Sequence, residues 1–198
     1  IPNNNEKEFV DIASKLGIKK LYFLYEFGTS HREIMKKFEL IQHKKITAEA
    51  GFIVNQKNIN AASQHSGMLA AKSSEHDRLL IEGKKVKIIY GFEEIHKKDY
   101  LHQRASGLNH ILCGLAAKNN IAVGMPYSSL FSKRHESSPI MGRIMQNINL
   151  CNKYGVKTII ASFSGNPFEL RAPHDISSLF SMLGMGSKNI RDSLRCDL

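Results

Sequence analysis

Apolar residues recur along the chain in two patterns that alternate from one end to the other. Short runs rich in β-branched residues, such as 156–161, predict buried strands, and longer segments with one apolar face, such as 6–16, predict amphipathic helices. The expected strands are 21–25, 45–54, 85–90, 121–124 and 156–161, and the expected helices are 6–16, 31–41, 58–71, 106–119, 139–154, 175–183 and one beginning near Ser187; residues 73–80 are ambiguous. Strands that alternate with helices, without hairpin turns, predict a parallel sheet.

The number of these units bears on how the sheet closes. About six or seven strand–helix units in one domain fit a closed or nearly closed barrel better than an open doubly wound sheet. A full (β/α)₈ barrel usually takes ~250 residues, and this chain has 198. We therefore expect a compact, TIM-barrel-like α/β fold with parallel strands and outer helices.

Segment 139–154 has the strongest helical pattern in the chain. Ser138 is a suitable N-cap, Pro139 suits the first helical turn, and Gly155 can end the helix. The apolar stripe expected to face the core is Met141, Ile144, Met145, Ile148 and Cys151, and the other faces carry Arg143, Gln146, Asn147 and Lys153.

The charge of the chain is strongly basic. Lys and Arg number 28 against 18 Asp and Glu, which gives a formal net charge of +10. This balance is typical of proteins with an acidic partner, nucleic acid first among them, although a basic enzyme fits it equally well. Lysines occur in pairs, and Lys133-Arg134 forms one basic pair, so a broad footprint on phosphates is plausible. The absence of Trp argues against base stacking as the main mode of binding.

Cysteine and histidine give no sign of a metal site or a disulfide framework. Cys113, Cys151 and Cys196 are odd in number and far apart, and no CxxC is present. The nine histidines form neither HxH nor HExxH, so we expect no metal on the protein. Cysteine usage of this kind indicates a reducing compartment, and we expect a cytoplasmic protein. No apolar run approaches the ~18 residues that span a bilayer, so we expect no membrane partner.

The loop that follows the last predicted strand has the densest candidate chemistry. Residues 162–175 bring Ser, Asn, Glu, Arg and Asp together directly after a buried strand, where α/β proteins commonly carry function. Pro167 and Pro173 stiffen the backbone on either side of Glu169 and Arg171. Arg104, Arg143, Glu169, Arg171 and Asp175 lie at element ends or within well-formed elements. They can form a structural ion-pair network or contact RNA or a partner, and the residues alone leave both possibilities open.

Three stretches together resemble one protein family. They are Arg104-Ala-Ser-Gly-Leu-Asn-His-Ile-Leu112, the segment 143–154 with its Arg-x-x-Gln-Asn pattern, and 161–175 with Pro-x-Glu-Leu-Arg-x-Pro. In combination they resemble the archaeal ribonuclease P protein component 3 family, the thirty-kilodalton protein subunit of that enzyme. The resemblance is strong over residues 85–185 and weaker before them.

The resemblance implies a TIM-barrel-like fold related to the polymerase-and-histidinol-phosphatase family, without the metal site of that family. It implies a non-catalytic subunit of the ribonucleoprotein that removes the 5′ leader of precursor tRNA. The catalytic site and its Mg²⁺ would then lie on ribonuclease P RNA. The protein would pair with a small ferredoxin-like subunit as a two-by-two heterotetramer and meet precursor tRNA through the complex. Since chains of this family usually begin with a strand before a motif like Ile1-Pro-Asn, we expect a single domain over 1–198 whose first strand can be incomplete.

The candidate residues divide into two groups under this interpretation. Candidates for contact with RNA or a partner are Arg104, Lys133, Arg134, Arg143, Gln146, Asn147 and Arg171, and candidates for a structural network are Asn109, Glu169 and Asp175. No catalytic residue is expected on the protein. Two other functions remain open: a free-standing metal-dependent phosphoesterase on the same barrel, and a purely structural protein–protein adaptor.

Overall fold

The computed structural model describes residues 1–40, 46–64, 67–96, 98–132 and 137–195. These residues form a parallel α/β structure, as the alternating pattern predicts. The strands are β1 Lys20–Glu26, β2 Thr47–Val54, β3 Met68–Lys72, β4 Ile88–Tyr90, β5 Ala122–Pro126 and β6 Thr158–Ala161. The helices are α1 Glu6–Lys15, α2 His31–Leu40, α3 Ile59–Ala62, α4 Asp77–Glu82, α5 His110–Asn119, α6 Ser129–Ser132, α7 Ser137–Tyr154, α8 Pro173–Met182 and α9 Ser187–Arg195, with 3₁₀ turns η1 Phe92–Glu94 and η2 Pro167–Glu169.

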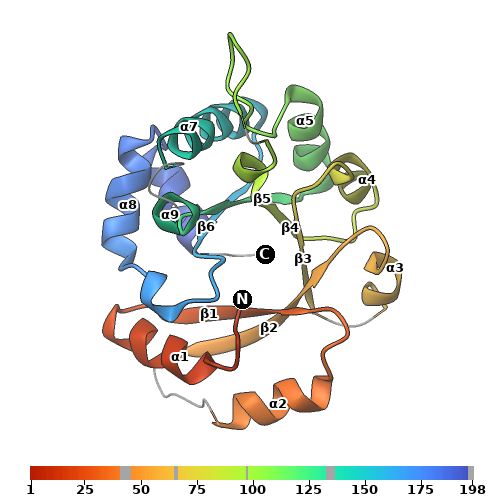
Figure 1. Cartoon of the computed structure of the whole chain (residues 1–198), viewed down its shortest axis with the longest axis vertical. Coiled ribbons are helices and arrows are strands. Elements are labelled where there is room, and N and C mark those ends of the chain that lie inside the picture. The colour runs from red at the N-terminus through yellow and green to blue at the C-terminus, as the bar shows by residue number, and fades with distance from the viewer. Residues whose placement is uncertain (41–45, 65–66, 97, 133–136, 196–198) are drawn as a thin grey trace.

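The sheet curls into an open barrel. Its strands pair in sequence order, β1-β2-β3-β4-β5-β6, and every pair is parallel. Helices lie around the outside of the arc (Figure 1). Within the described residues β1 and β6 are the two unpaired edges. A cavity of about 190 Å³ lies between them, and residue 1 borders it. The expectation of a TIM-barrel-like fold with outer helices is therefore confirmed.

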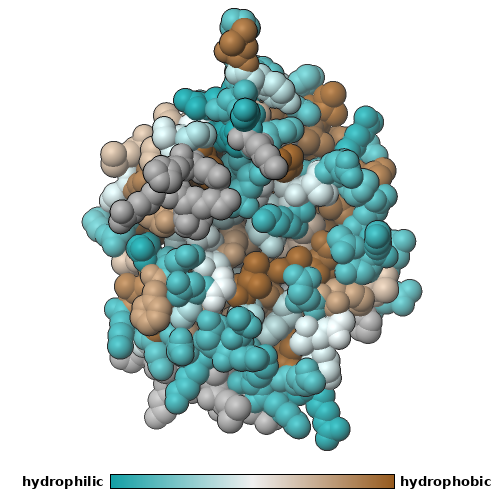
Figure 2. All heavy atoms as spheres, in the orientation of Figure 1, coloured by the Kyte–Doolittle hydropathy of each residue, from teal (hydrophilic) through white to brown (hydrophobic). Residues whose placement is uncertain are grey.

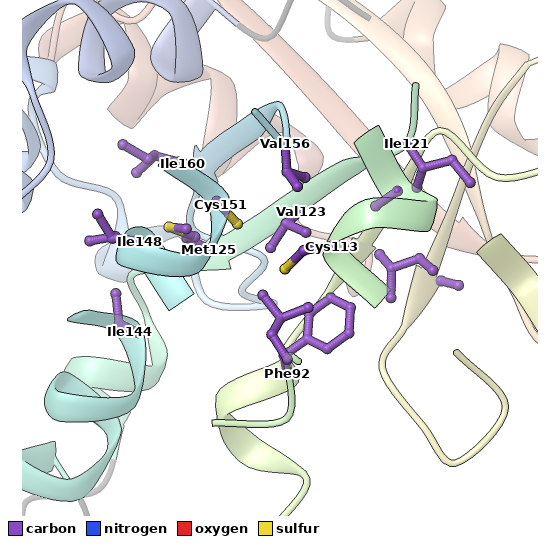
Figure 3. Close-up of a cluster of buried hydrophobic side chains, with 14 of the residues drawn as sticks. Phe92, Cys113, Ile121, Val123, Met125, Ile144, Ile148, Cys151, Val156 and Ile160 are labelled. Atoms are coloured by element: carbon purple, nitrogen blue, oxygen red, sulfur yellow. The ribbon is translucent and has the colours of Figure 1, made fainter. Parts of the chain in front are cut away.

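Alternate residues of each strand enter two separate apolar layers. Ile88, Tyr90 and Ile159 face the barrel interior, whereas their neighbours Ile89 and Ile160 face the helices. This alternation follows from the period of two along a strand. In Figure 3 the outer layer is filled by side chains from β5, β6, α5 and α7, including the buried free thiols Cys113 and Cys151. Figure 2 shows apolar surface at the centre of the view, over the region enclosed by the curled sheet in Figure 1.

One predicted element is wrong and several boundaries move. Segment 58–71 is not a single helix, because it contains the short helix α3 and the start of β3. Gly67, with a φ of +152°, separates these two elements, and the alanine-rich β3 is buried on both faces, so packing overrides helix propensity. The predicted helix at 106–119 begins at His110. Ser138 lies inside α7 and is not its N-cap.

The face of α7 that meets the core differs from the predicted stripe. Met141 and Met145 are exposed, while Arg143 and Asn147 are buried beside Ile144. Compared with the predicted orientation, α7 therefore turns Arg143 and Asn147 toward the interior, where both side chains form hydrogen bonds. Among the described helices, none has the length and apolar character needed to cross a membrane.

Candidate functional site

Two long loops at the carboxyl ends of strands hold four of the ten predicted residues, Arg104, Asn109, Glu169 and Arg171. The β4 loop, residues 91–109 apart from 97, connects β4 to α5, and the β6 loop, residues 162–172, connects β6 to α8. In a parallel barrel the carboxyl ends of all strands reach the same face, where (β/α)₈ enzymes carry their active sites. We therefore expect the functional residues on this face of the barrel.

Arg143 anchors the β4 loop from α7. Its side chain is only 4% exposed, and its Nε donates to Asp99 Oδ1 at 2.7 Å. Its Nη1 donates to the carbonyl oxygens of Glu93 at 3.0 Å and His96 at 2.6 Å. One guanidinium thus binds three points of one loop, which its planar fork of donors suits better than a lysine would.

Asp99 joins Arg143 to a second arginine. It accepts from the Ala105 amide at 2.9 Å and from Arg104 Nη1 at 3.2 Å. The pKa of Asp99 is lowered, first by the Ala105 hydrogen bond and then by the two arginines, so the carboxylate stays charged. Arg104 lies across α7 directly over Gly142, where a Cβ atom would be 2.4 Å from Arg104 Cζ.

The segment that follows Arg104 packs against η1 and α7. Gly107 has a φ of +81° and lies so close to η1 that an added Cβ would be 2.3 Å from the Phe92 carbonyl oxygen. Only glycine meets both conditions without strain. Asn147 Nδ2 donates to the Ser106 carbonyl oxygen at 3.0 Å, and Asn109 caps α5 by accepting from the Leu112 amide at 2.9 Å. The Arg-Ala-Ser-Gly-Leu-Asn motif therefore fixes the base of the β4 loop.

A buried carboxyl group lies beside this anchor. Glu93 is 1% exposed, and its Oε1 is 3.4 Å from Ser129 Oγ. Burial raises the pKa of Glu93 from 4.5 to about 7. Glu93 therefore changes charge near neutral pH at the point where the β4 loop meets α6.

The β6 loop is held by its own side chains. Ser164 Oγ donates to Glu169 and accepts from the Asn166 amide at 2.9 Å, and Asn166 Oδ1 accepts from the Phe168 amide at 3.0 Å. Ser128 Oγ donates to the Ser162 carbonyl oxygen and so connects this loop to the end of β5. These bonds form a rigid turn around η2.

The outer end of the β6 loop presents an arginine and two aromatic rings. Arg171 Nη1 donates to the carbonyl oxygens of Phe168 at 2.8 Å and Leu170 at 2.9 Å. Its guanidinium also lies 5.0 Å from the centre of the Phe131 ring of α6. Phe168 is 73% exposed and Phe131 is 46% exposed. Arginine and aromatic surfaces of this kind are enriched where proteins contact RNA or other proteins.

The inner end of the β6 loop fills the barrel interior. Phe163 stacks on Tyr90 of β4, with ring centres 4.2 Å apart and planes 13° from parallel. Gly124 of β5 makes room for this pair, since a Cβ there would lie 2.6 Å from Tyr90 Cβ and 2.9 Å from Phe163 Cζ. The interior is therefore packed at this level.

The predicted residues fall into separate groups in the structure. Arg104, Arg143 and Asn147 share the β4-loop anchor, together with Asn109 at its end, and Glu169 and Arg171 share the β6 loop. Gln146 is half-buried on α7, and Asp175 is exposed in the first turn of α8. Lys133 and Arg134 lie outside the described residues. Contact of any of these residues with RNA or a partner stays a prediction.

Sequence reasoning missed three residues of this network. Asp99, Glu93 and Ser129 bond with the anchor or lie against it, yet none stands in a recognisable motif. Asp99 follows lysines in a polar stretch, where a solvated carboxylate is the ordinary expectation. Within the described parts of the chain, no three His, Cys, Asp or Glu side chains are placed to hold a metal ion.

Known proteins resemble this chain in sequence and in fold. The family described as RNase P subunit p30 matches residues 93–197, which include the β6 loop and the β4 loop from residue 93 onward. Ribonuclease P protein component 3 of Methanococcus maripaludis strain S2 is 27% identical over 153 residues, covering 74% of this chain and 65% of that protein. The Methanothermobacter thermautotrophicus protein of the same name is 30% identical over 96 residues, covering 48% and 39%.

A solved structure has the same fold. A chain in the cryo-EM structure of archaeal ribonuclease P with mature tRNA superposes with a TM-score of 0.77 and 16% identity, over 98% of this chain and 85% of that one. The chain spans two thirds or less of the length of the curated relatives that it matches. The family match covers more than half of the chain and coincides with the anchored loops. The chain thus belongs to the RNase P subunit p30 family.

Proposed function

We propose that this chain is a protein subunit of ribonuclease P that supports the catalytic RNA in removing the 5′ leader of precursor tRNA. The observation that carries the proposal is the family match over residues 93–197. That segment contains Asp99 and Arg143, whose buried contacts give the family motifs a physical role. The net charge of +10 and the fold shared with a chain of archaeal ribonuclease P support the same function.

Under this proposal the protein is a rigid platform and not the catalyst. Arg143 and Arg104 hold the β4 loop against α7, and the β6 loop is fixed around Glu169. Both loops therefore keep their shape before a partner arrives, which lowers the entropic cost of assembly. The chemistry, with its Mg²⁺, belongs to the RNA subunit.

The proposal extends to the protein partner. We propose pairing with a small ferredoxin-like subunit as a two-by-two heterotetramer in the cytoplasm, as the family resemblance implies. The exposed Phe168 of the β6 loop and the pair formed by Arg171 with Phe131 of α6 supply a surface of suitable chemistry. Size-exclusion chromatography with light scattering of the two co-expressed proteins measures the stoichiometry directly. A mass equal to one copy of each chain would contradict the two-by-two arrangement.

The RNA bound in cells tests the function. The tagged chain would be purified under native conditions from the cells that encode it, and the RNA bound to it would be sequenced. Ribonuclease P RNA and precursor tRNA should be enriched. A tagged Arg143→Ala variant is compared with the wild type, because loss of the anchor should lower that enrichment. Enrichment of unrelated RNA, or of none, would contradict the proposal.

A metal-dependent phosphoesterase makes a different prediction. It requires the purified protein alone to hydrolyse a phosphoester with added Mn²⁺ or Zn²⁺, in a reaction that a chelator stops. The described residues provide no cluster of three metal-ligating side chains for such a site. We therefore expect the isolated protein to be inert in this assay.

A further inference from the structure

The two ends of the strands differ sharply in charge. The described residues of the segments that follow strands carry four basic and five acidic side chains, at Lys57, Lys98, Arg104 and Arg171 and at Glu75, Glu93, Glu94, Asp99 and Glu169. The described residues of the segments between a helix and the next strand carry five lysines and no acidic side chain, at Lys19, Lys84, Lys85, Lys87 and Lys157. Among the described residues of these connecting segments, the basic excess thus lies at the amino ends of the strands, opposite the candidate site. We call these five lysines the basic rim.

The lysines of the basic rim are available to a partner. All five are exposed, and among the described residues none of them forms a salt bridge. Lys85 Nζ donates to Asn60 Oδ1 at 2.6 Å, which is a neutral acceptor and leaves the charge uncompensated. The nearby acids include Glu82, which is paired with Arg78 at 2.8 Å, and Asp192, on the wall of a 470 Å³ cavity that Lys157 also lines. Asp192 alone cannot balance the rim.

The backbone fixes the spacing of the basic rim. The Lys87 carbonyl oxygen accepts from the Ala122 amide at 2.9 Å, and the Lys157 carbonyl oxygen accepts from the Val123 amide at 2.9 Å. Lys87 and Lys157 therefore precede strands on either side of β5, two strand spacings apart, or about 10 Å. Lys118 and Lys153, in the last turns of α5 and α7, extend the same end of the barrel.

Ordinary structural causes account for only part of the basic rim. Lysines in the last turn of a helix are favoured by the helix dipole, which explains Lys118 and Lys153. Lys84 directly follows the C-cap of α4, Gly83, whereas Lys19 and Lys157 lie three or more residues past the ends of α1 and α7, so the dipole explains only part of the rim. Lys84, Lys85 and Lys87 also repel one another in the free protein. A surface of this kind gains most when a polyanion covers it.

We infer that the basic rim binds the phosphate backbone of an RNA helix without reading its sequence. Lysine is a flexible point charge with no bidentate geometry, which suits phosphates and not base edges. An RNA helix presents a phosphate every few ångströms, so a row about 10 Å long meets several of them. The inference rests on the proposed function and adds an RNA surface on the face opposite the β4 and β6 loops.

Salt dependence of binding to a defined RNA tests the rim. Fluorescence anisotropy with a labelled RNA duplex of about 20 base pairs and arbitrary sequence gives the slope of log Kobs against log salt. The triple substitution Lys84→Gln, Lys87→Gln and Lys157→Gln should lower the magnitude of that slope by about 2 to 3, or about one unit for each phosphate that the protein no longer neutralises. The matched control, Lys7→Gln, Lys36→Gln and Lys57→Gln, has the same net charge at other exposed positions and should change the slope by less than about 1.

Each result decides the inference separately from the proposed function. If the salt-dependence slope falls equally in the rim and control variants, or if the wild-type protein binds no RNA, the proposed RNA surface is wrong. A rim variant that loses affinity for a polyglutamate peptide but not for RNA would assign the surface to an acidic protein and also overturn it. If the slope falls as expected while the protein fails to support tRNA processing, the rim stands and the proposed function fails.

Discussion

Replacing Arg143 with alanine should detach the β4 loop from α7. The substitution removes the donor to Asp99 Oδ1 at 2.7 Å and the donors to two backbone carbonyl oxygens, those of Glu93 and His96. The guanidinium is buried, so water does not simply replace it. The loop segment between residues 93 and 99 would then lose its main attachment to the rest of the barrel.

The magnitude follows from what remains after the substitution. Removing one partner of a buried ion pair costs about 3–5 kcal/mol. Asp99 keeps Arg104 and the Ala105 amide and is 25% exposed, which places the loss at the low end, about 3 kcal/mol. For a protein of this size about 3 kcal/mol corresponds to a fall of about 6–12 °C in Tm.

Urea unfolding and limited proteolysis measure this loss together. Arg143→Ala should lower the unfolding free energy by about 3 kcal/mol, and chymotrypsin should cleave faster at Tyr100 and Leu101, the exposed apolar residues of the projecting loop (Figure 1). Arg143→Lys should lower the unfolding free energy almost as much, because an ammonium group cannot reach all three acceptors. Arg191→Ala, an exposed arginine of α9, is the control and should stay within about 0.5 kcal/mol of wild type.

A small effect would refute the reasoning. If Arg143→Ala unfolds within about 1 kcal/mol of wild type and the proteolysis rate is unchanged, Arg143 does not anchor the loop. Its role in the family motif would then have to be contact with a partner.

The remaining predictions concern Gly107 beside η1, the buried carboxyl group of Glu93 and Arg171 of the β6 loop. Gly107→Ala should destabilise the protein by more than about 2 kcal/mol in urea unfolding, because the new Cβ meets the Phe92 carbonyl oxygen and the φ is positive; an unchanged midpoint would contradict the close approach. Glu93 has a folded pKa of about 7 against 4.5 unfolded, so its contribution is present below pH 4.5 and is lost as pH rises toward 7. Glu93→Gln should therefore flatten the stability profile over that window and be more stable than wild type at pH 8, by up to about 3 kcal/mol; parallel profiles would contradict the raised pKa. Arg171→Ala should weaken assembly or activity of the ribonucleoprotein while Tm changes little; a variant with full activity and unchanged partner binding would remove Arg171 from the interface.

The spacing of apolar residues along the chain predicted most of the alternating strands and helices of the barrel. Most strands and helices were predicted because buried parallel strands and amphipathic helices each leave a clear spacing. The helix expected at 58–71 failed because Ala and Met favour helices in isolation, whereas β3 gains its stability by pairing with β2 and β4. Such non-local pairing leaves no local signal in an alanine-rich segment.

The buried polar residues of α7 show the limit of a hydrophobic pattern. Arg143 and Asn147 are read as solvated by composition alone, yet both are buried. Asp99 and loop carbonyl oxygens accept from Arg143, and the Ser106 carbonyl oxygen accepts from Asn147 Nδ2. Met141 and Met145 were expected inside and are exposed. Neither result can be read from α7 alone, since the partners lie more than 35 residues away in the sequence.

The candidate residues were found through the motifs, and their grouping was found only in the structure. The sequence proposed a structural network or an RNA contact for Arg104, Arg143 and Arg171 without separating the two. The structure places Arg143 in a buried anchor and Arg171 on an exposed loop beside Phe131. Asp99, which joins two of the arginines, carried no signal because a single carboxylate in a lysine-rich loop has no characteristic spacing.

Cleavage of precursor tRNA tests the central claim most directly. An archaeal ribonuclease P RNA would be assayed for 5′ leader removal at limiting Mg²⁺, with and without this protein and the small ferredoxin-like subunit, and the isolated protein would be assayed alongside. Rescue of cleavage by the protein pair, with an inert isolated protein, is the predicted result. No rescue, together with metal-dependent phosphoester hydrolysis by the protein alone, would contradict it and make the barrel an enzyme in its own right.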